Sequence, residues 1–231
     1  MKKQKIVVLT GAGISAESGI ATFRGSGGLW EGHDIMEVAS PEGWAKNPEL
    51  VLHFYNLRRA DAAKTQPNAA HKALAKLEEK YEVIVITQNV DDLHERGGSS
   101  NVVHLHGELA KVRSTKYPEL IYDIGGDAIQ LGDTCDKGAQ LRPHIVWFGE
   151  AVPMIEKAVL MAHDADIFMV IGTSMAVYPA ASLIHYVDAE TPKYLIDPFI
   201  PEVVQDIPNL TPIAEKATIG VTNLVEELLA K

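Results

Sequence analysis

The amino-acid sequence predicts an α/β protein in which a parallel sheet forms the main domain and two insertions form a smaller one. The first observation is a series of short apolar runs, such as residues 6–9, 83–86 and 167–171, each followed by glycine or polar residues. The second is that segments of helical period separate these runs, which is typical of a parallel sheet covered on both faces. The third is the segment 110–142, rich in Gly, Asp and Lys, which interrupts the alternation and indicates an excursion from the main fold.

Composition restricts the possible classes of function. The 231 residues carry 21 basic and 31 acidic side chains, a formal net charge of −10. Nucleic acid is therefore an unfavourable partner, because phosphate binding needs a basic surface. No apolar run could cross a bilayer and the N-terminus leads into a strand rather than a signal peptide, so we expect a cytoplasmic protein with no membrane partner. The single cysteine, Cys135, excludes an intrachain disulfide and a metal site with several thiolates from one chain.

The first predicted strand, residues 6–9, leads into a glycine-rich turn. Gly11, Gly13 and Ala16 fit the pattern G-x-G-x-x-G/A. In a turn from strand to helix, these small residues permit a tight bend and let a pyrophosphate approach the backbone at the helix N-terminus. The acidic ribose ligand that dehydrogenases carry about 20 residues later is missing, because Glu31 lies in a predicted loop. The turn therefore predicts a dinucleotide site unlike that of an ordinary dehydrogenase.

Helix caps and periodicity predict the remaining elements. Asn47, followed by Pro48, is a good helix start, and this helix is expected to run to about Lys64. Asn68 is expected to cap a second helix with an apolar stripe. Further strands are predicted at 102–105, 144–148 and 194–196, and further helices at 155–162, 179–187 and 222–229.

Five of the predicted strands end in polar or glycine-rich segments. Because ligands of parallel sheets bind beyond the carboxyl ends of the strands, these segments are expected to line one crevice. They are GAGIS (11–15), TQNVD (87–91), LHGE (105–108), GTS (172–174) and Ile196–Asp197.

On these segments the sequence resembles the sirtuins, a family of NAD-dependent protein lysine deacylases. The shared motifs run in the family's order over nearly the whole chain: GAGISAESGIATFR (11–24), TQNVD (87–91), LHGEL (105–109), RPHIVWFGE (142–150), GTSMAVYPAA (172–181) and a closing strand near Ala217. The resemblance implies a Rossmann-like NAD-binding domain of residues 1–28, 68–109 and 143–231. The small domain would consist of residues 29–67 and of 110–142, a zinc-free remnant of the family's zinc-binding module.

The resemblance also implies the reaction. The carbonyl oxygen of an acyl-lysine attacks C1′ of the ribose of NAD as nicotinamide leaves, and the ribose 2′-hydroxyl then attacks the imidate to give deacylated lysine and O-acyl-ADP-ribose. Histidine suits the base at neutral pH, and position in the motif implies His106, with Asn89 as the second catalytic residue. Strand periodicity alone cannot separate His106 from His104, which we expect to be packed or hydrogen-bonded. A metal site of these two with His94 lacks a carboxylate or thiolate at a convincing spacing.

The resemblance implies that NAD contacts residues from all five segments. Asn89 and Asp91 would lie near the nicotinamide and ribose, although the residues alone equally suit a polar turn at a strand end. Asp197 stands where many relatives have Asn; its carboxylate can accept from ribose hydroxyls and would repel a 2′-phosphate, which favours NAD over NADP. The expected cofactor-binding residues are Gly11, Ala12, Gly13, Ser15, Phe23, Arg24, Gln88, Asn89, Asp91, Gly172, Thr173, Ser174, Asp197 and Ala217, with Phe23 and Arg24 forming a mobile lid.

The peptide substrate is expected to bind as an added strand. By resemblance, it lies between two segments, Val146, Phe148, Gly149 and Glu150 on one side and Val177 and Tyr178 on the other.

Tyr55 and Arg58 carry the prediction of acyl specificity. At a spacing of three on a helix they share a face, and a guanidinium with a phenol hydroxyl suits a carboxylate. A Tyr-x-x-Arg pair plays this part in the sirtuins that remove malonyl, succinyl or glutaryl groups, where a small residue, here Ala39, leaves room. A solvated arginine beside a tyrosine at the edge of the core is the structural alternative. We expect removal of acidic acyl groups and of acetyl.

The zinc module departs most from the family pattern. Sirtuins usually carry two Cys-x-x-Cys pairs in this region, but Ser114 and Tyr117 replace the first pair and only Cys135 remains of the second. One thiolate cannot make a structural site that needs four ligands, so we predict no zinc and no other metal. Apolar contacts are expected to hold the segment instead, through Tyr117, Leu120, Ile121, Tyr122, Ile124 and Leu131.

Two other functions remain open at this point. The first is an NAD-dependent ADP-ribosyltransferase, which mass spectrometry of the products would distinguish. The second is a non-catalytic module that binds NAD or acyl-lysine, suggested by the lost zinc ligands, for which a comparison with His106→Tyr in a nicotinamide-release assay would be decisive. An ordinary dehydrogenase is disfavoured by the missing acid.

Overall fold

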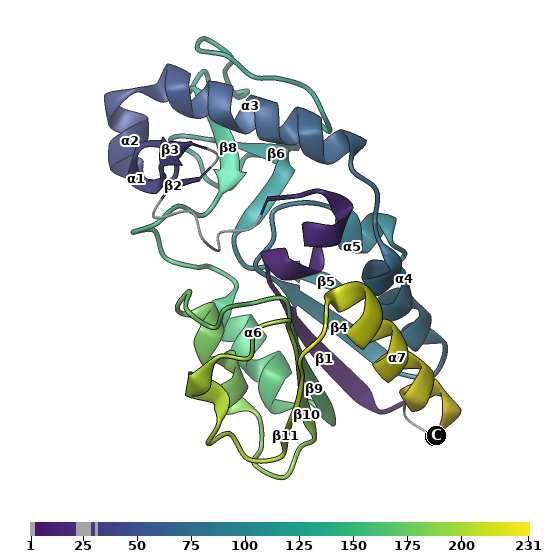
Figure 1. Cartoon of the computed structure of the whole chain (residues 1–231). Helices are drawn as coiled ribbons and strands as arrows, with labels where there is room; N and C mark the ends of the chain where they lie inside the picture. The colour runs from purple at the N-terminus through teal and green to yellow at the C-terminus, as the bar shows by residue number, and fades with distance from the viewer. Residues whose placement is uncertain (1–2, 22–28, 31) are drawn as a thin grey trace.

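The computed structural model describes residues 3–21, 29–30 and 32–231 and confirms the predicted fold class. Its largest element is a parallel sheet of six strands (Figure 1). The strands are β1 (Lys5–Thr10), β4 (Glu82–Thr87), β5 (Val102–His104), β9 (Ile167–Ile171), β10 (Lys193–Ile196) and β11 (Leu210–Ile213).

The strand order is β11-β10-β9-β1-β4-β5. The first strand of the chain therefore lies inside the sheet, between β4 and β9. From the boundary between β1 and β9, successive strands are added in opposite directions. Ligands of open parallel sheets bind in the crevice at such a reversal, beyond the carboxyl ends of the strands.

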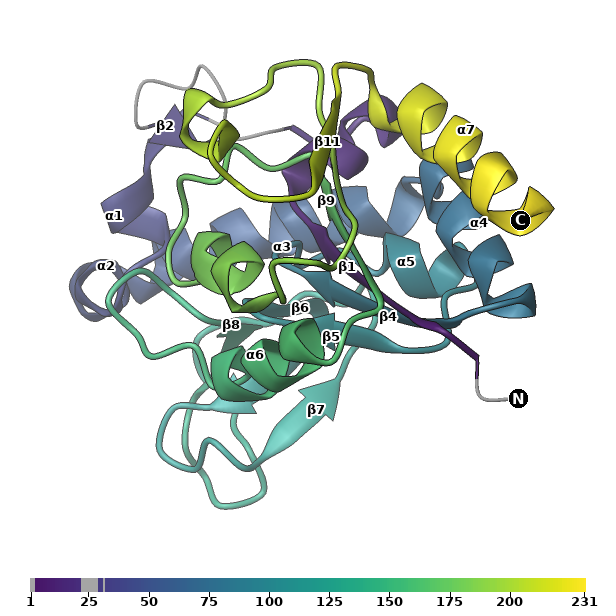
Figure 2. The same ribbon diagram turned by 90° about the horizontal axis from the view of Figure 1, so that it is seen from below.

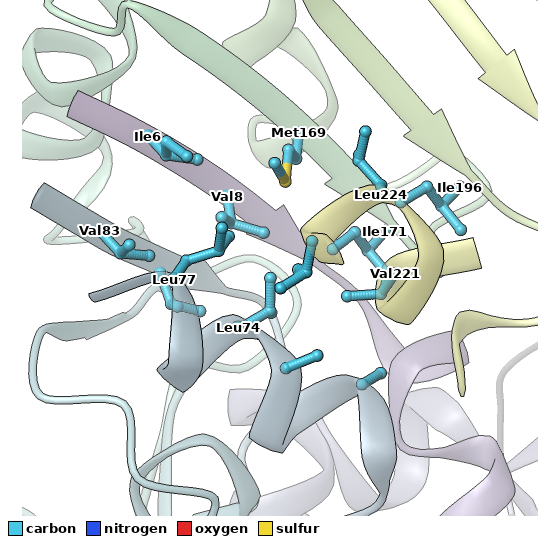
Figure 3. Close-up of a cluster of buried hydrophobic side chains, with 14 of the residues drawn as sticks. Ile6, Val8, Leu74, Leu77, Val83, Met169, Ile171, Ile196, Val221 and Leu224 are labelled. Atoms are coloured by element: carbon cyan, nitrogen blue, oxygen red, sulfur yellow. The ribbon is translucent and has the colours of Figure 1, made fainter. Parts of the chain in front are cut away.

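Helices cover both faces of this sheet, because alternate strand residues point to opposite sides. On one face, Ile6 and Val8 belong to a cluster with helices α4 (Ala69–Lys76) and α7 (Ala217–Ala230), shown in Figure 3. On the other, Val7 and Leu9 pack with α6 (Ile155–His163) and the 3₁₀ helix η4 (Ala180–Tyr186). The two clusters form the core.

A second, antiparallel sheet has the order β7-β6-β8. Its strands are β6 (Gly107–Ser114), β7 (Ile121–Asp123) and β8 (Leu141–Ile145). Helix α3 (Pro48–Lys64) lies across β6 and β8 (Figure 1), and the side chain of Asn47 caps it, as predicted, by accepting from the N–H of Leu50. Figure 2 shows β7 and its flanking loops projecting away from the large sheet.

The other elements are short. They are η1 (Ala12–Ile14), η2 (Ala16–Ser18), β2 (Leu29–Trp30), β3 (His33–Asp34), α1 (Ile35–Val38), α2 (Pro41–Lys46), η3 (Leu77–Glu79), α5 (Leu93–Arg96) and η5 (Glu202–Val204). Within the described residues, no helix has the length and apolar character needed to cross a membrane.

The strand predicted at 144–148 was placed too late in the chain. Strand β8 ends at Ile145. The backbone then turns, because the N–H of Trp147 donates to the carboxylate of Glu150 and the N–H of Glu150 donates to the carbonyl of Trp147. These local bonds replace the pairing of a continuing strand.

The closing strand predicted near Ala217 is present, but it ends at Ile213, and Ala217 is already the first residue of α7. The last strand is β11, and the final helix begins five positions before the predicted start at Thr222. Gly220, a weak helix former, lies inside this helix, where an added Cβ would be 2.7 Å from Cγ2 of Ile196. Close packing on the sheet thus outweighs local helix propensity.

The expected helix directly after the first glycine turn is also absent from the described residues. Two 3₁₀ turns, η1 and η2, occupy this place, and η2 has no buried residue that could form the apolar face of a longer helix. The predicted helix at 179–187 is likewise the 3₁₀ helix η4.

Candidate active site

The glycine turn after β1 lies directly against the turn after β9. The N–H of Gly11 donates to the carbonyl of Ile171 (3.0 Å), and the N–H of Gly13 donates to that of Gly172 (2.8 Å). A Cβ on Gly13 would lie 2.5 Å from Cα of Gly172, so the two backbones leave room only for hydrogen. The reversal of strand order therefore brings two predicted cofactor-binding segments into contact.

A buried cluster of hydrogen-bonded side chains is attached to the glycine turn after β1. The side-chain amide of Asn89 donates to the carbonyl of Gly11 (3.2 Å) and to the hydroxyl of Ser15 (3.2 Å), which in turn donates to the carboxylate of Asp91 (3.2 Å). His71 Nε2 lies 3.5 Å from the same hydroxyl. Burial raises the pKa of Asp91, although its hydrogen bonds oppose the shift. Three predicted site residues thus form one unit.

His106 lies in the turn between β5 and β6. Its Nδ1 is 3.0 Å from the carbonyl oxygen of Gln88. A carbonyl oxygen can only accept, so Nδ1 carries the ring proton and Nε2 retains its lone pair. Burial lowers the pKa of His106, and the bond to Gln88 opposes this only in part. The ring is therefore neutral near neutral pH, with Nε2 as a base.

His104 has a different environment. Its Nδ1 bonds to the carbonyl of Asn89 (3.1 Å) and its Nε2 bonds to the carboxylate of Glu95 (2.8 Å), which confirms the expectation of a hydrogen-bonded histidine. Burial lowers the pKa of His104, but the hydrogen bond and charge of Glu95 outweigh it, so the pKa is raised. In the part of the chain that the structure describes, no group of three or more His, Cys, Asp or Glu residues could hold a metal ion.

Two further predicted residues join neighbouring strand ends. The side-chain amide of Gln88 donates to the hydroxyl of Thr173 (3.3 Å), which connects the end of β4 to the end of β9. Asp197 is buried at the end of β10, where its carboxylate accepts from the N–H of Phe199 (2.8 Å).

The other predicted cofactor-binding residues are more varied in their exposure. Ala12 is half-buried, Ser174 is exposed, and Ala217 is buried at the start of α7. Phe23 and Arg24, the predicted lid, lie outside the described residues.

The segment after β8 connects the predicted peptide site to the predicted base. The N–H of Val146 donates to the carbonyl of His106 (2.9 Å), and the N–H of Phe148 donates to that of Ala39 (2.9 Å). Ala39 is buried. These bonds place the backbone of the segment beside two other predicted site residues.

The side chains predicted to face the peptide are largely at the surface. Phe148 is 42% exposed and Tyr178 is 67% exposed. Gly149 is exposed and Val177 is half-buried. They lie on the loops that follow β8 and β9.

The predicted acyl-carboxylate pair lies on α3. Tyr55 is fully buried, and its hydroxyl accepts a hydrogen bond from the indole N–H of Trp147 (3.1 Å). Burial raises the pKa of Tyr55, so the phenol stays protonated. Arg58 is half-buried, with its guanidinium carbon 5.5 Å from the centroid of the Phe54 ring.

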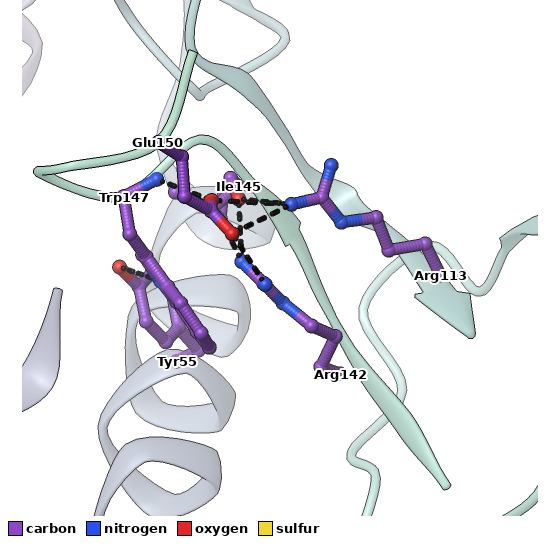
Figure 4. Close-up of polar contacts among 6 residues, drawn as sticks. All are labelled: Tyr55, Arg113, Arg142, Ile145, Trp147 and Glu150. Carbon is purple, nitrogen blue, oxygen red and sulfur yellow. Dashed lines mark hydrogen bonds and ion pairs between the residues drawn. The ribbon is translucent and has the colours of Figure 1, made fainter. Parts of the chain in front are cut away.

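Glu150, predicted to contact substrate, has its carboxylate bound within the protein (Figure 4). Arg142 binds it through two bonds of 2.7 and 3.1 Å, and Arg113 adds a contact of 3.2 Å. The N–H of Trp147 donates to the same carboxylate (2.9 Å). Glu150 therefore supports the loop that carries the predicted peptide-binding residues.

In the segment predicted to be a remnant of the zinc module, several hydrogen bonds meet at the hydroxyl group of Ser114. Ser114 Oγ accepts from the N–H of Tyr117 (3.1 Å) and from the thiol of Cys135 (3.3 Å). Lys137 lies 4.4 Å from the centroid of the Tyr117 ring. Ser114 and Tyr117 carry no thiolate and Cys135 supplies only one, so these positions do not offer the four-ligand donor set of a structural zinc site.

The expected apolar contacts in this module are only partly present. Tyr122 and Ile124 pack against the buried residues Val112 and Ile129. Ile121 and Leu131, in contrast, are 44% and 46% exposed, so their predicted role was wrong. Hydrogen bonds, such as those to Ser114, therefore stabilise this segment together with the apolar contacts.

Sequence reasoning missed Arg59. This residue is 2% exposed, and it joins α3 to β6 by donating from Nε to the carbonyl of Leu109 (2.6 Å). Burial lowers its pKa to about 10. It also lines a cavity of about 230 Å³, which Asp91 and His104 line as well. Its spacing of four from the buried Tyr55 was the signal that could have revealed it.

The order of the parallel strands, with a buried polar cluster and a neutral histidine beside the reversal, defines an α/β protein of the Rossmann-like, dinucleotide-binding class. Residues 11–179 match the Sir2 family, and the chain belongs to this family.

Close relatives carry the name NAD-dependent protein deacylase. The protein from Helicobacter pylori (strain J99 / ATCC 700824) is 59% identical over 195 residues, which cover 84% of this chain and 83% of that protein. The protein from Bacteroides thetaiotaomicron is 54% identical over 200 residues, covering 84% and 86%.

Solved structures agree in fold. A Sir2 homologue in complex with NAD matches with a TM-score of 0.88 at 41% identity, over 99% of this chain and 90% of that one. A Sir2 protein bound to an acetylated peptide matches with a TM-score of 0.80 at 29% identity, over 99% and 95%.

Proposed function

We propose that this chain is an NAD-dependent protein lysine deacylase that acts on acylated lysine in polypeptides. The observation that carries the proposal is a neutral His106, with an unprotonated Nε2, on the same sheet edge as the Asn89–Ser15–Asp91 cluster and the paired glycine turns. The names of the bacterial relatives support the activity. Structural neighbours bound to NAD and to acetylated peptide support both substrates.

Each residue has a proposed task. Bound NAD supplies the bond between nicotinamide and ribose that breaks. Nε2 of His106 accepts a proton from a ribose hydroxyl, because its lowered pKa keeps it neutral. Asn89 and Asp91 orient the ribose and the nicotinamide carboxamide, held in place by the shared hydroxyl of Ser15. The N–H groups of Gly11, Gly13 and Gly172 donate within the protein, so other backbone N–H groups of the same two turns serve the phosphates.

The proposal extends to the type of acyl group. Tyr55 supplies a protonated phenol and Arg58 a guanidinium on the same helix, and Ala39, in the same buried cluster as Tyr55, has only a small side chain. These donors suit the terminal carboxylate of succinyl- or malonyl-lysine. An acetyl group lacks this carboxylate but fits the same space, so both types of substrate are expected.

The division into a Rossmann-like domain and a small domain, at the boundaries predicted from the sequence, belongs to the same proposal. The peptide is proposed to add as a strand along the segment after β8. The exposed side chains of Phe148 and Tyr178 support this site.

Product analysis tests the proposed activity. The enzyme is incubated with NAD and with acetyl-, succinyl- and malonyl-lysine peptides, and mass spectrometry is used to detect nicotinamide and O-acyl-ADP-ribose. His106→Tyr is expected to abolish both products. Transfer of ADP-ribose to the polypeptide, without loss of the acyl group, would refute the proposal.

Arg58→Met tests the acyl preference separately. It should lower kcat/KM for the succinyl peptide far more than for the acetyl peptide. Only the succinyl group has a terminal carboxylate, and this carboxylate loses the guanidinium that binds it. If desuccinylation is unchanged while acetyl turnover falls, the acidic-acyl assignment fails and the deacylase proposal stands.

A further inference from the structure

The indole of Trp147 restricts the orientation of the Tyr55 hydroxyl. Its Nε1 lies 3.1 Å from Tyr55 Oη, and both side chains are buried. An indole nitrogen can only donate, so the phenol oxygen is the acceptor of this bond. The phenol proton must then be donated in a direction away from the indole. Tyr55 is thereby fixed as a donor toward whatever else its hydroxyl meets.

The indole itself is clamped. The guanidinium carbon of Arg142 lies 3.3 Å from the centroid of the Trp147 ring, and Glu150 binds this guanidinium through two hydrogen bonds (Figure 4). Glu150 also accepts from the backbone N–H of Trp147 and from Arg113 on β6. Both the ring and the backbone of Trp147 are therefore held by one carboxylate and its arginines, which leaves the N–H little freedom to turn away from Tyr55.

This restriction matters for one class of substrate. A succinyl or malonyl group ends in a carboxylate, which can accept the phenol proton; an acetyl group ends in a methyl, which cannot. A hydroxyl that accepts from Trp147 and donates to the carboxylate uses both of its functions at once. With the indole N–H removed, the hydroxyl loses the bond that directs its proton away from Trp147, and with it this preorganisation.

We propose that Trp147 is a positioning residue for acidic acyl groups: its N–H sets Tyr55 as the donor, and the Arg142–Glu150 pair holds the indole in place. The inference rests on the proposed function of Tyr55. It adds that acyl selectivity depends on the loop after β8 as well as on the pair on α3.

Trp147→Phe is the direct test, because it keeps an aromatic ring for Arg142 and removes only the N–H and part of the ring area. The ratio of kcat/KM for a succinyl peptide to kcat/KM for the matched acetyl peptide is expected to fall about tenfold, the scale of one lost hydrogen bond. Tyr55→Phe is expected to lower the ratio at least as much. The double variant should match Tyr55→Phe alone, because Trp147 acts through the hydroxyl that is already missing.

The outcomes separate the inference from the function on which it rests. If Trp147→Phe lowers both activities equally, or if the two substitutions multiply, the residue is merely structural and the inference fails. If Tyr55→Phe changes the ratio but Trp147→Phe does not, the inference fails while the acyl assignment stands. If neither changes it, the acyl assignment itself is refuted.

Arg142→Lys provides a second variant, should Trp147→Phe not fold as judged by its thermal midpoint. Lysine keeps a charge for Glu150 but cannot stack on the indole as a planar group. The same ratio should fall by a smaller factor, again only when Tyr55 is present. An unchanged ratio in a folded Arg142→Lys protein would contradict the proposed role of Arg142 in holding the indole of Trp147.

Discussion

Gly13 donates its N–H to the carbonyl of Gly172, and the two backbones are in such close contact that a Cβ on Gly13 would lie 2.5 Å from Cα of Gly172. This contact joins the turns that follow β1 and β9, on the two sides of the reversal in strand order. The shape of the proposed phosphate site is therefore fixed by one backbone meeting another, with no side chain between them that could adjust.

Gly13→Ala should therefore damage both stability and NAD binding. The added methyl would meet three backbone atoms of Gly172 at 2.5 to 2.9 Å, and the turns must separate to admit it. We expect a loss of about 2–3 kcal/mol in the free energy of unfolding, measured by urea denaturation, with weakened binding of ADP-ribose by calorimetry.

Gly126→Ala is the matched control. An added Cβ there would lie 3.5 Å from Ala63, an ordinary contact. Its free energy of unfolding should change by no more than about 0.5 kcal/mol. If the Gly13→Ala protein were as stable as the Gly126→Ala protein, the close contact between the backbones of Gly13 and Gly172 would be contradicted.

The pH dependence of the reaction should identify the base. Burial lowers the pKa of His106 below its ordinary 6.5, whereas the net effect of burial and Glu95 raises that of His104. A base must be neutral to act, so activity falls as the pH drops through its pKa. The acid limb of kcat/KM for nicotinamide release should therefore have its midpoint below 6.5.

An acid limb centred above the ordinary histidine pKa would instead point to His104. The two residues can also be separated by substitution. His106→Asn should lower kcat by about 10² to 10⁴. His104→Gln should retain an acid limb at the wild-type position.

The pair His104–Glu95 should make stability depend on pH. Because the folded pKa of His104 is raised, its contribution is fully present below the unfolded pKa and is lost as the pH rises through the folded value. The pKa of Glu95 is lowered: burial raises it, but the bond and charge of His104 outweigh burial. Its contribution is lost as the pH falls through the folded value.

The difference in unfolding free energy between wild type and Glu95→Gln should thus be largest between these two pKa values and smaller at both extremes. Urea denaturation over a pH series measures it. Glu226→Gln, on an exposed face of α7, should show no such maximum. A flat difference for Glu95→Gln would contradict the pair.

The remnant module is predicted to fold without zinc. Elemental analysis of the purified protein should find no stoichiometric metal, and a chelator should leave the thermal midpoint and the activity unchanged. Ser114→Ala should be destabilising by about 1–3 kcal/mol, because the N–H of Tyr117 and the thiol of Cys135 lose their acceptor. One zinc per chain would overturn this prediction.

The sequence predicted those elements whose cause is local. Strands β1, β4 and β9 follow from apolar runs that end in turn residues, and Asn47 is visible as a cap before Pro48. The motif residues at the strand ends, such as Ser15 and Asn89, do meet in space. Their convergence follows from the rule that parallel strands share a carboxyl edge.

Features set by distant contacts could not be predicted. The turn that ends β8 depends on Glu150, whose position depends on Arg113 of another strand. The clamp on Trp147 has the same origin. The start of the last helix was predicted too late because packing of α7 on the sheet, rather than local propensity, decides where that helix begins.

The interior position of β1 has a consequence for biosynthesis. This strand leaves the ribosome before the other strands of its sheet, but its two neighbours begin at Glu82 and Ile167. Until β9 has been made, one side of an apolar strand has no partner, and the gap lies in the middle of the future sheet. Completion of the sheet must therefore await synthesis of most of the chain, and a nascent or truncated product that ends before β9 would expose a strand edge to other chains and to chaperones.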